Sequence, residues 1–204
     1  MFNGFLRRHF SPSTQMWMKH MMGTAKVHWC RVVMNREMES YVASLPISGM
    51  DALEISGTKW KDFGFHSYRC IGYPEYDVCN QVLPNSFDVI IAEQVFEHIM
   101  RPDKAARNVL DMLRPNGLFV ISTPMLIKYH PVPLDLYRWT ELGMKTLLQD
   151  AGFVAVETHS WGNRACVKAD MTPDQIWTYY KPLWHSLKND PRFPIVVWAF
   201  ARKS

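Results

Sequence analysis

Carboxylate and imidazole side chains gather just after the most strand-like stretch of the sequence. Glu93, Gln94, Glu97 and His98 follow the β-branched run 87–92. Because an imidazole titrates near neutrality, His98 is a candidate general base toward a hydroxyl group. Two other interpretations stay open: Glu97, His98 and Glu93 as a divalent-metal site, or Glu97 at a helix dipole with His98 in a local hydrogen bond. We favour the structural interpretation and assign no metal ligands.

A second group of polar side chains lies between residues 128 and 138. His130 is the other candidate base, and Tyr137 and Arg138 are candidate substrate contacts. Trp161 and Arg164 come later in the chain and complete the set of expected pocket residues. Aromatic groups with a few convergent polar ones favour a small molecule or a glycan over a long polymer.

The turn Ser56-Gly57-Thr58 follows the short apolar segment 52–55. Small residues after a strand let a ligand approach backbone N–H groups, and the nearby Glu54 could fix a cationic or hydroxyl group. A tight strand-to-helix turn explains the same residues equally well. Because a complete G-x-G-x-x-G is missing, a nicotinamide oxidoreductase is disfavoured.

Short apolar strands alternate with helices from residue 49 onward. We expect strands at 52–55, 68–71, 87–92, 118–122, 154–158 and 195–200. Helices are expected over 93–113 and from Thr140, an N-cap, to Gly152, a stop signal. This alternation predicts an α/β fold with a mainly parallel sheet, whose ligands bind beyond the carboxyl ends of the strands.

Several linked segments resemble class I S-adenosylmethionine-dependent methyltransferases, in the group labelled type 11 or 12. The family's F-D-x-(I/V) strand, the turn ending in E-H and L-(R/K)-P-G-G are similar to residues 87–98 and 113–118. Residues 51–55 resemble the first motif, and 137–153 resemble Y-R-(Y/W)-T…L-x-x-A-G-F. The resemblance runs in order across 51–158.

The resemblance implies a Rossmann-like sheet of seven strands with an antiparallel last strand, and S-adenosyl-L-methionine as cofactor. It also implies cofactor contacts at residues that match the family's motifs or lie beside them: Glu54, Ser56, Gly57, Thr58, Tyr73, Asp77, Glu93 and Gln94. Two departures stand out. Only Gly57 remains of the glycine-rich motif, and Gly72 occupies the place of the acid that pairs with ribose, where Glu75 or Asp77 could substitute. These departures motivate the alternative of an inactive binding or scaffold protein.

The 204 residues suit one domain of 49–204 preceded by an N-terminal helical cap, 1–48. The connection 159–193 is expected to be a lid over the ligand edge, or else a packing helix over 176–187. Trp 8, Tyr 8, Phe 11 and Met 13 are frequent, and we expect them to line a partly lidded pocket.

Charge and cysteine content exclude several classes. A net charge of +4 without a basic run argues against nucleic acid, and no apolar stretch reaches the ~20 residues of a membrane helix. Four scattered cysteines and no secretory signal indicate a cytoplasmic protein with reduced thiols. The expected function is methyl transfer to oxygen or nitrogen of a small-molecule or sugar acceptor.

Overall fold

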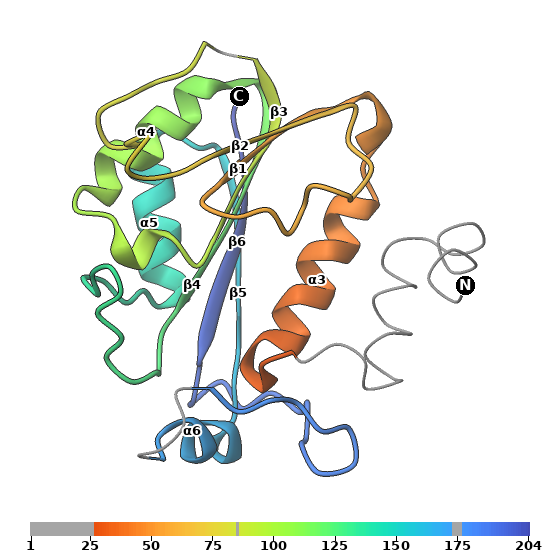
Figure 1. The fold of residues 1–204 in the computed structure, drawn as a ribbon, viewed down its shortest axis with the longest axis vertical. Coiled ribbons are helices and arrows are strands. Elements are labelled where there is room, and N and C mark those ends of the chain that lie inside the picture. The colour runs from red at the N-terminus through yellow and green to blue at the C-terminus, as the bar shows by residue number, and fades with distance from the viewer. Residues whose placement is uncertain (1–26, 85, 173–176) are drawn as a thin grey trace.

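A computed structural model describes residues 27–84, 86–172 and 177–204, which form a sheet with helices on both faces (Figure 1). The expected helices before residue 27 lie outside the described residues. The described part begins with the short 3-10 helix η1 (Trp29–Arg31) and the helix α3 (Val32–Ala43). A second 3-10 helix, η2 (Ile47–Gly49), leads into the sheet.

The sheet has six strands in the order β2-β1-β3-β4-β6-β5. Their bounds are β1 (Asp51–Ile55), β2 (Ser67–Ile71), β3 (Phe87–Glu93), β4 (Leu113–Pro124), β5 (Ala155–Trp161) and β6 (Val196–Arg202). The first four strands are mutually parallel, and β6 lies antiparallel between β4 and β5. All six strands expected from the sequence, the α/β class and the antiparallel last strand are confirmed.

The expected count of seven strands is wrong for the described residues. Between the end of β2 at Ile71 and the start of β3 at Phe87, the described residues 72–84 and 86 form turns and irregular chain, without a further strand or helix. A parallel crossover with its own helix takes a dozen or more residues, so this stretch has no room to add a strand as well. β2 is therefore an edge strand of the described sheet.

Helices cover the two faces of the sheet unequally (Figure 1). The helices α4 (Pro102–Met112) and α5 (Glu141–Ala151) lie on one face, and α3 lies on the other. Thr140 caps α5 by accepting the Gly143 N–H at 3.1 Å, and Gly152 ends it in the left-handed region, as expected. The expected helix 93–113 is divided into the 3-10 helix η3 (Phe96–His98) and α4.

Alternate side chains of the strands enter two apolar cores. Ile90 and Phe119 face α4 and α5, whereas Ile91 and Val120 face α3. Met34 and Met38 of α3 are fully buried in the second core. This part of the predicted N-terminal cap therefore forms a layer of the same domain, and the boundary at residue 48 stays a prediction.

The connection between β5 and β6 contains one short helix, α6 (Arg164–Asp170). The alternative helix over 176–187 is wrong for its described residues, which form turns and extended chain. Their backbone instead pairs with the chain at the start of η1 and just before it, since the Trp29 N–H donates to Thr178 O at 2.7 Å and the Tyr180 N–H to Val27 O at 2.8 Å. These pairings use the backbone groups that a helix would need for itself.

Candidate functional site

The loops after β1 and β3 lie side by side where the strand order reverses. From β1 the chain moves to β2 on one side and then crosses to β3 on the other, with Glu54 in register with Ile91. In open α/β sheets a ligand binds outside the carboxyl ends at such a switch point. Ser56 and Gln94, the residues that open the two loops, both have positive φ, 61° and 58°. Left-handed non-glycine residues cluster where function constrains the backbone.

The buried Glu54 carboxylate fixes the loop after β1 by hydrogen bonds. Its side chain is 2% exposed and accepts the N–H groups of Lys59 at 3.2 Å and Trp60 at 3.0 Å, and the Tyr68 hydroxyl at 2.6 Å. Burial and the adjacent carboxylate raise the pKa of Tyr68. A Cβ on Gly57 would lie 2.6 Å from Glu54 Oε1, so the glycine is needed for this packing. Glu54 thus holds the loop that exposes Ser56 and Thr58.

Glu93, at the end of β3, carries an ion pair that the sequence did not reveal. Lys59 Nζ lies 2.9 Å from Glu93 Oε2 and 3.3 Å from Glu39 Oε1, and it also donates to Asn35 Oδ1 at 3.1 Å. The buried Trp60 donates its indole N–H to Glu93 at 3.4 Å. The loop 56–66 is therefore fixed to β3 by side chains, and no helix follows β1.

The remaining expected cofactor residues lie at the same edge, with different surroundings. Gln94 donates its backbone N–H to Ser122 O at 2.9 Å, which ties the loop after β3 to β4. Tyr73 is 79% exposed beyond β2. Asp77 caps its own turn by accepting the Cys79 N–H at 2.8 Å and the Asn80 amide at 2.7 Å. Its carboxylate oxygens are thus engaged in local bonds.

Glu97 and His98 lie in η3, next to the end of β3. Glu97 is 1% exposed, and burial raises the pKa of its carboxyl to about 7. His98 Nε2 lies 3.6 Å from Glu97 Oε1, and His98 Nδ1 is hydrogen bonded to Leu134 O. Burial of Glu97 argues for a built site rather than an exposed charge at a helix end.

The loop after β4 brings the second candidate base to the first. The rings of His98 and His130 lie 5.1 Å apart in an edge-on arrangement, and burial lowers the pKa of His130. Asp135 accepts the His130 backbone N–H at 2.9 Å and is held by both terminal nitrogens of Arg138. Tyr137 lies on the same loop and donates its backbone N–H to Glu97 O at 3.3 Å.

Trp161 and Arg164 lie in different surroundings. Trp161 is 1% exposed in the α3-side core, with its indole N–H donating to Leu187 O at 3.0 Å. Arg164 is exposed in the first turn of α6. A cavity of about 380 Å³ touches Trp161 and is lined by β5, β6 and α3, away from the ends of β1 and β3. Because this cavity shares no other expected site residue, we do not place the site there.

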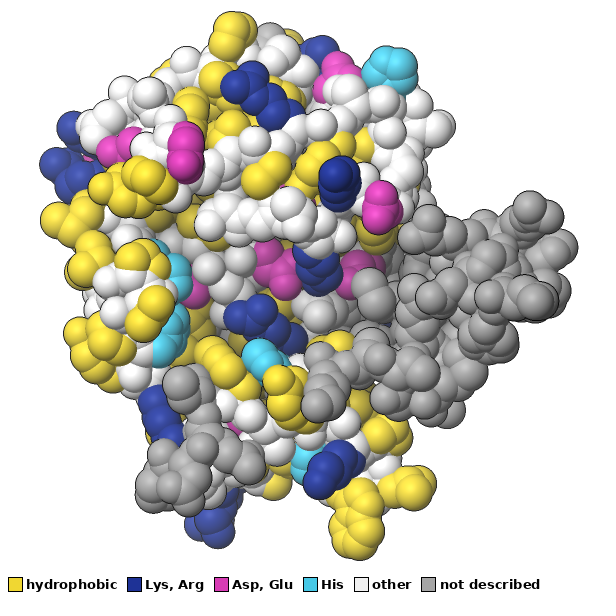
Figure 2. Space-filling model, in the orientation of Figure 1, with side chains coloured by type: hydrophobic (Ala, Val, Ile, Leu, Met, Phe, Trp, Pro, Cys, Tyr) yellow, Lys and Arg dark blue, Asp and Glu magenta, His cyan; other side chains and the backbone are white. Residues whose placement is uncertain are grey.

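The surface shown in Figure 2 carries acidic, basic and histidine side chains close together near its centre. Such mixed polarity at a recess differs from the apolar lining that the aromatic content led us to expect. The tryptophans explain the difference, because four of the eight are buried in the core: Trp29, Trp60, Trp161 and Trp198.

Among the residues that the structure describes, no helix is both long and apolar enough to cross a lipid bilayer.

The sequence matches the methyltransferase domain family over residues 22–159, about two thirds of the chain. The chain belongs to this methyltransferase family. A protein of Mycolicibacterium smegmatis named as a probable S-adenosylmethionine-dependent methyltransferase is 33% identical to it over 98 residues, 42% of this chain. The match spans only 38% of that relative's length.

Solved structures show the same methyltransferase fold at low identity. An S-adenosylmethionine-dependent methyltransferase from Mesorhizobium loti has a TM-score of 0.52 and 18% identity, covering 82% of this chain and 97% of its own. The Haemonchus contortus phosphoethanolamine N-methyltransferase 2, solved with phosphomonomethylethanolamine and S-adenosylhomocysteine, has a TM-score of 0.55 and 13% identity. That match covers 100% of this chain and 60% of the other. At these identities the likeness is one of fold.

Proposed function

We propose that this chain is an S-adenosyl-L-methionine-dependent methyltransferase whose cofactor lies across the carboxyl ends of β1 and β3. Family membership supports the cofactor, since the mycobacterial relative is named for it. The observation that carries the placement is the reversal of strand order between β1 and β3, where the left-handed Ser56 and Gln94 open adjacent loops. The expected cofactor residues from Glu54 to Thr58, with Glu93 and Gln94, all lie on these two loops or the strands before them.

Charge at this edge suits a zwitterionic ligand. Glu93 and Glu39 together hold one ammonium group, that of Lys59. The amino acid part of S-adenosyl-L-methionine presents an ammonium and a carboxylate, so Lys59 and the two carboxylates offer a partner for each. The attraction between opposite charges is stronger in a partly buried, low-dielectric site than in water. When the ligand binds, Lys59 and the two carboxylates can exchange partners with its ammonium and carboxylate, so that the charges of the ligand are paired.

We place the acceptor against the loop after β4, where His98, His130, Tyr137 and Arg138 lie near the cofactor edge. Methyl transfer is an in-line displacement at a sulfonium, so positioning contributes most of the catalysis. A poor nucleophile such as a hydroxyl also needs a base, and the imidazoles of His98 and His130 are the candidates for it. This arrangement favours a small-molecule or sugar acceptor methylated on oxygen or nitrogen.

The competing function is that of a binding or scaffold protein with the same fold. The observations that favour it are the absence of a helix after β1 and the Lys59–Glu93 pair, which already occupies the loop edge. The two functions differ in one measurable property, which is affinity for the cofactor and its product.

The test is calorimetric titration of the full chain with S-adenosylmethionine and S-adenosylhomocysteine. Ser56→Gly and Ser56→Val form a matched pair, because φ of 61° is free for glycine and costly for a β-branched residue. We expect the wild type and Ser56→Gly to bind, and Ser56→Val to bind roughly tenfold more weakly, since strain of this kind is of order 1–3 kcal/mol. No binding of either ligand would refute the proposed activity. Equal affinity of all three proteins would refute the placement at this loop.

A further inference from the structure

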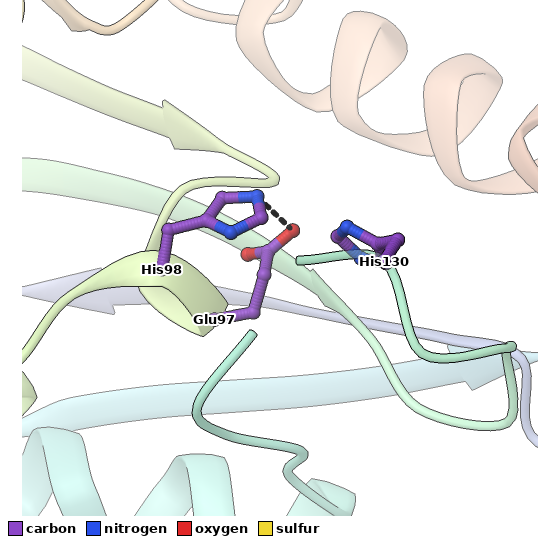
Figure 3. Close-up of side chains that lie close together, drawn as sticks. All are labelled: Glu97, His98 and His130. Carbon is purple, nitrogen blue, oxygen red and sulfur yellow. Dashed lines mark ion pairs between the residues drawn. The ribbon is translucent and has the colours of Figure 1, made fainter. Parts of the chain in front are cut away.

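Three metal-ligating side chains from two separate loops meet beside the proposed acceptor position. Glu97 and His98 come from η3 after β3, and His130 comes from the loop after β4 (Figure 3). One ligand atom from each lies within 4.8 Å of the other two. Figure 3 shows the Glu97 carboxylate between the two imidazole rings. β3 and β4 are adjacent parallel strands, so their carboxyl ends bring the two loops together.

Two polar atoms of these three side chains are buried without a partner. Glu97 Oε2 and His130 Nε2 are shielded from solvent and form no hydrogen bond with the described residues. Glu97 as a whole is 1% exposed. An ionised carboxylate removed from water is costly unless it is paired or binds a metal, and buried polar atoms are rarely left unsatisfied. The two atoms therefore point to a ligand that accepts electron pairs from both.

The hydrogen bond of His98 selects the ring form that a metal requires. His98 Nδ1 is bonded to the carbonyl oxygen of Leu134, which only accepts. Nδ1 therefore carries the proton, and in the neutral ring Nε2, on the side of Glu97, presents its lone pair. An Nδ1–H donated to a backbone carbonyl is the usual second contact of a histidine that binds a metal through Nε2.

The loop that carries His130 is fixed by contacts outside the cluster. Asp135 accepts the His130 backbone N–H and is held by Arg138, whose Nη2 donates to Asp135 Oδ2 at 2.6 Å. Leu136 donates its N–H to the backbone oxygen of Glu97 at 2.9 Å. Arg138 is thereby held by Asp135, and Arg31 lies over the Trp177 ring at 5.6 Å. Both positive charges favour the ionised form of Glu97 from a distance, but among the described residues neither arginine forms an ion pair with it.

We propose that Glu97, His98 and His130 bind one divalent first-row transition-metal ion, with Zn²⁺ or Co²⁺ the best match to two imidazoles and a carboxylate. Ligand atoms in a tetrahedral site lie about 3.4 Å apart, as follows from metal–ligand bonds of about 2.1 Å. His98 Nε2 and Glu97 Oε1 are 3.6 Å apart, so this pair already has nearly the required separation. The ligand atoms all lie within 4.8 Å of one another, so the widest separation must contract by at most about 4.8 − 3.4 = 1.4 Å on binding.

Three protein ligands leave at least one position open, which distinguishes such a site from a closed structural one. Provided that the proposed function holds, the hydroxyl group of the acceptor can bind the metal at this open position. A bound metal lowers the pKa of a coordinated hydroxyl, which loses its proton to solvent and attacks the methyl carbon as the sulfonium C–S bond breaks to give a thioether. In this proposal the metal ion replaces a free imidazole as the group that activates the hydroxyl, and the two histidines act as its ligands.

The test titrates Co²⁺ into the full chain after removal of metals with a chelator. The visible absorption of the metal reports its geometry, and a near-ultraviolet thiolate band would reveal binding by exposed Cys70 instead. We expect one equivalent bound by nitrogen and oxygen ligands. Glu97→Gln and His130→Gln should each weaken binding roughly tenfold or more, the loss typical of even an outer contact. His66→Gln is the matched control, because His66 is exposed and outside the cluster, and it should bind as the wild type does.

Each other outcome overturns the inference. Failure of the wild type to bind Co²⁺, a thiolate spectrum, or wild-type affinity in both Glu97→Gln and His130→Gln would each exclude this metal site. Circular dichroism of each variant shows whether it is folded, and a variant that unfolds is replaced by His98→Gln. Because the titration needs no S-adenosylmethionine, a failed methyltransferase assay and a failed metal site remain distinguishable.

Discussion

Gly57 cannot carry a side chain unless the Glu54 carboxylate moves. The Cβ of Gly57→Ala would lie 2.6 Å from Glu54 Oε1, whereas ordinary contacts begin at 3.4 Å, so the two atoms must separate by 3.4 − 2.6 = 0.8 Å. Glu54 Oε1 accepts the Lys59 N–H at 3.2 Å, and a shift of that size removes this bond. The loop after β1 would then lose one of its anchors.

The size of the effect follows from the bond that is lost. A hydrogen bond to a charged group contributes about 1.5–3 kcal/mol. Gly57 does not have positive φ, so alanine also lowers the entropy of the unfolded chain, which stabilises the protein by about 0.4–1 kcal/mol. The net expectation is a loss of about 1–2 kcal/mol in the free energy of unfolding.

Urea denaturation of four proteins measures this coupling: the wild type, Gly57→Ala, Glu54→Ala and the double variant. Glu54→Ala destabilises by itself, but it removes the obstacle, so Gly57→Ala should be neutral or slightly stabilising in that background. Gly49→Ala is the control, because a Cβ at Gly49 meets nothing within 4 Å. The reasoning is refuted if Gly57→Ala has the same effect in both backgrounds, or if Gly49→Ala destabilises as much.

Two further predictions concern the neighbouring strand β2. Gly72→Asp should raise the affinity for S-adenosylhomocysteine roughly tenfold, because a carboxylate there can accept both ribose hydroxyls and each charge-assisted bond contributes over 1 kcal/mol. A Cβ at Gly72 has its nearest neighbour at 3.7 Å, so Gly72→Ala serves as the control, and calorimetry showing equal affinity for both variants would contradict the idea. Burial and Glu54 raise the pKa of Tyr68 in the folded state, so the phenol holds its proton more tightly than in the unfolded chain. Its contribution to stability is complete below the ordinary pKa of about 10 and declines as the pH rises above it. Tyr68→Phe should therefore flatten the fall in urea stability above that pH, and an unchanged slope would show that other groups cause it.

The strands and helix ends were predictable because their signals are local. Alternating apolar runs located all six strands, and Thr140 and Gly152 marked the limits of α5 through their own backbone and side-chain chemistry. The seventh strand came from the family resemblance rather than from a run of residues, and the described chain has none. Periodicity in this chain was therefore a better guide to strand number than the family pattern.

The site was harder to predict because its contacts join residues far apart in the chain. Sequence reasoning selected His98 and His130 separately, but their meeting depends on β3 pairing with β4. Lys59 was missed because nothing in the sequence around it, a polar loop, indicates that its ammonium group pairs with Glu93. Trp161 was expected to line a pocket, yet whether an aromatic residue enters the core depends on what packs over it.

The place of β6 in the sheet has a consequence for how the protein is made. β6 is the last of the six strands in chain order, yet it lies between β4 and β5 and pairs with both. During synthesis β4 and β5 must wait with open edges until residues 196–202 have left the ribosome. Unpaired apolar edges invite association with other chains. A nascent chain stalled before β6 should therefore depend on chaperones to an extent that the finished domain does not.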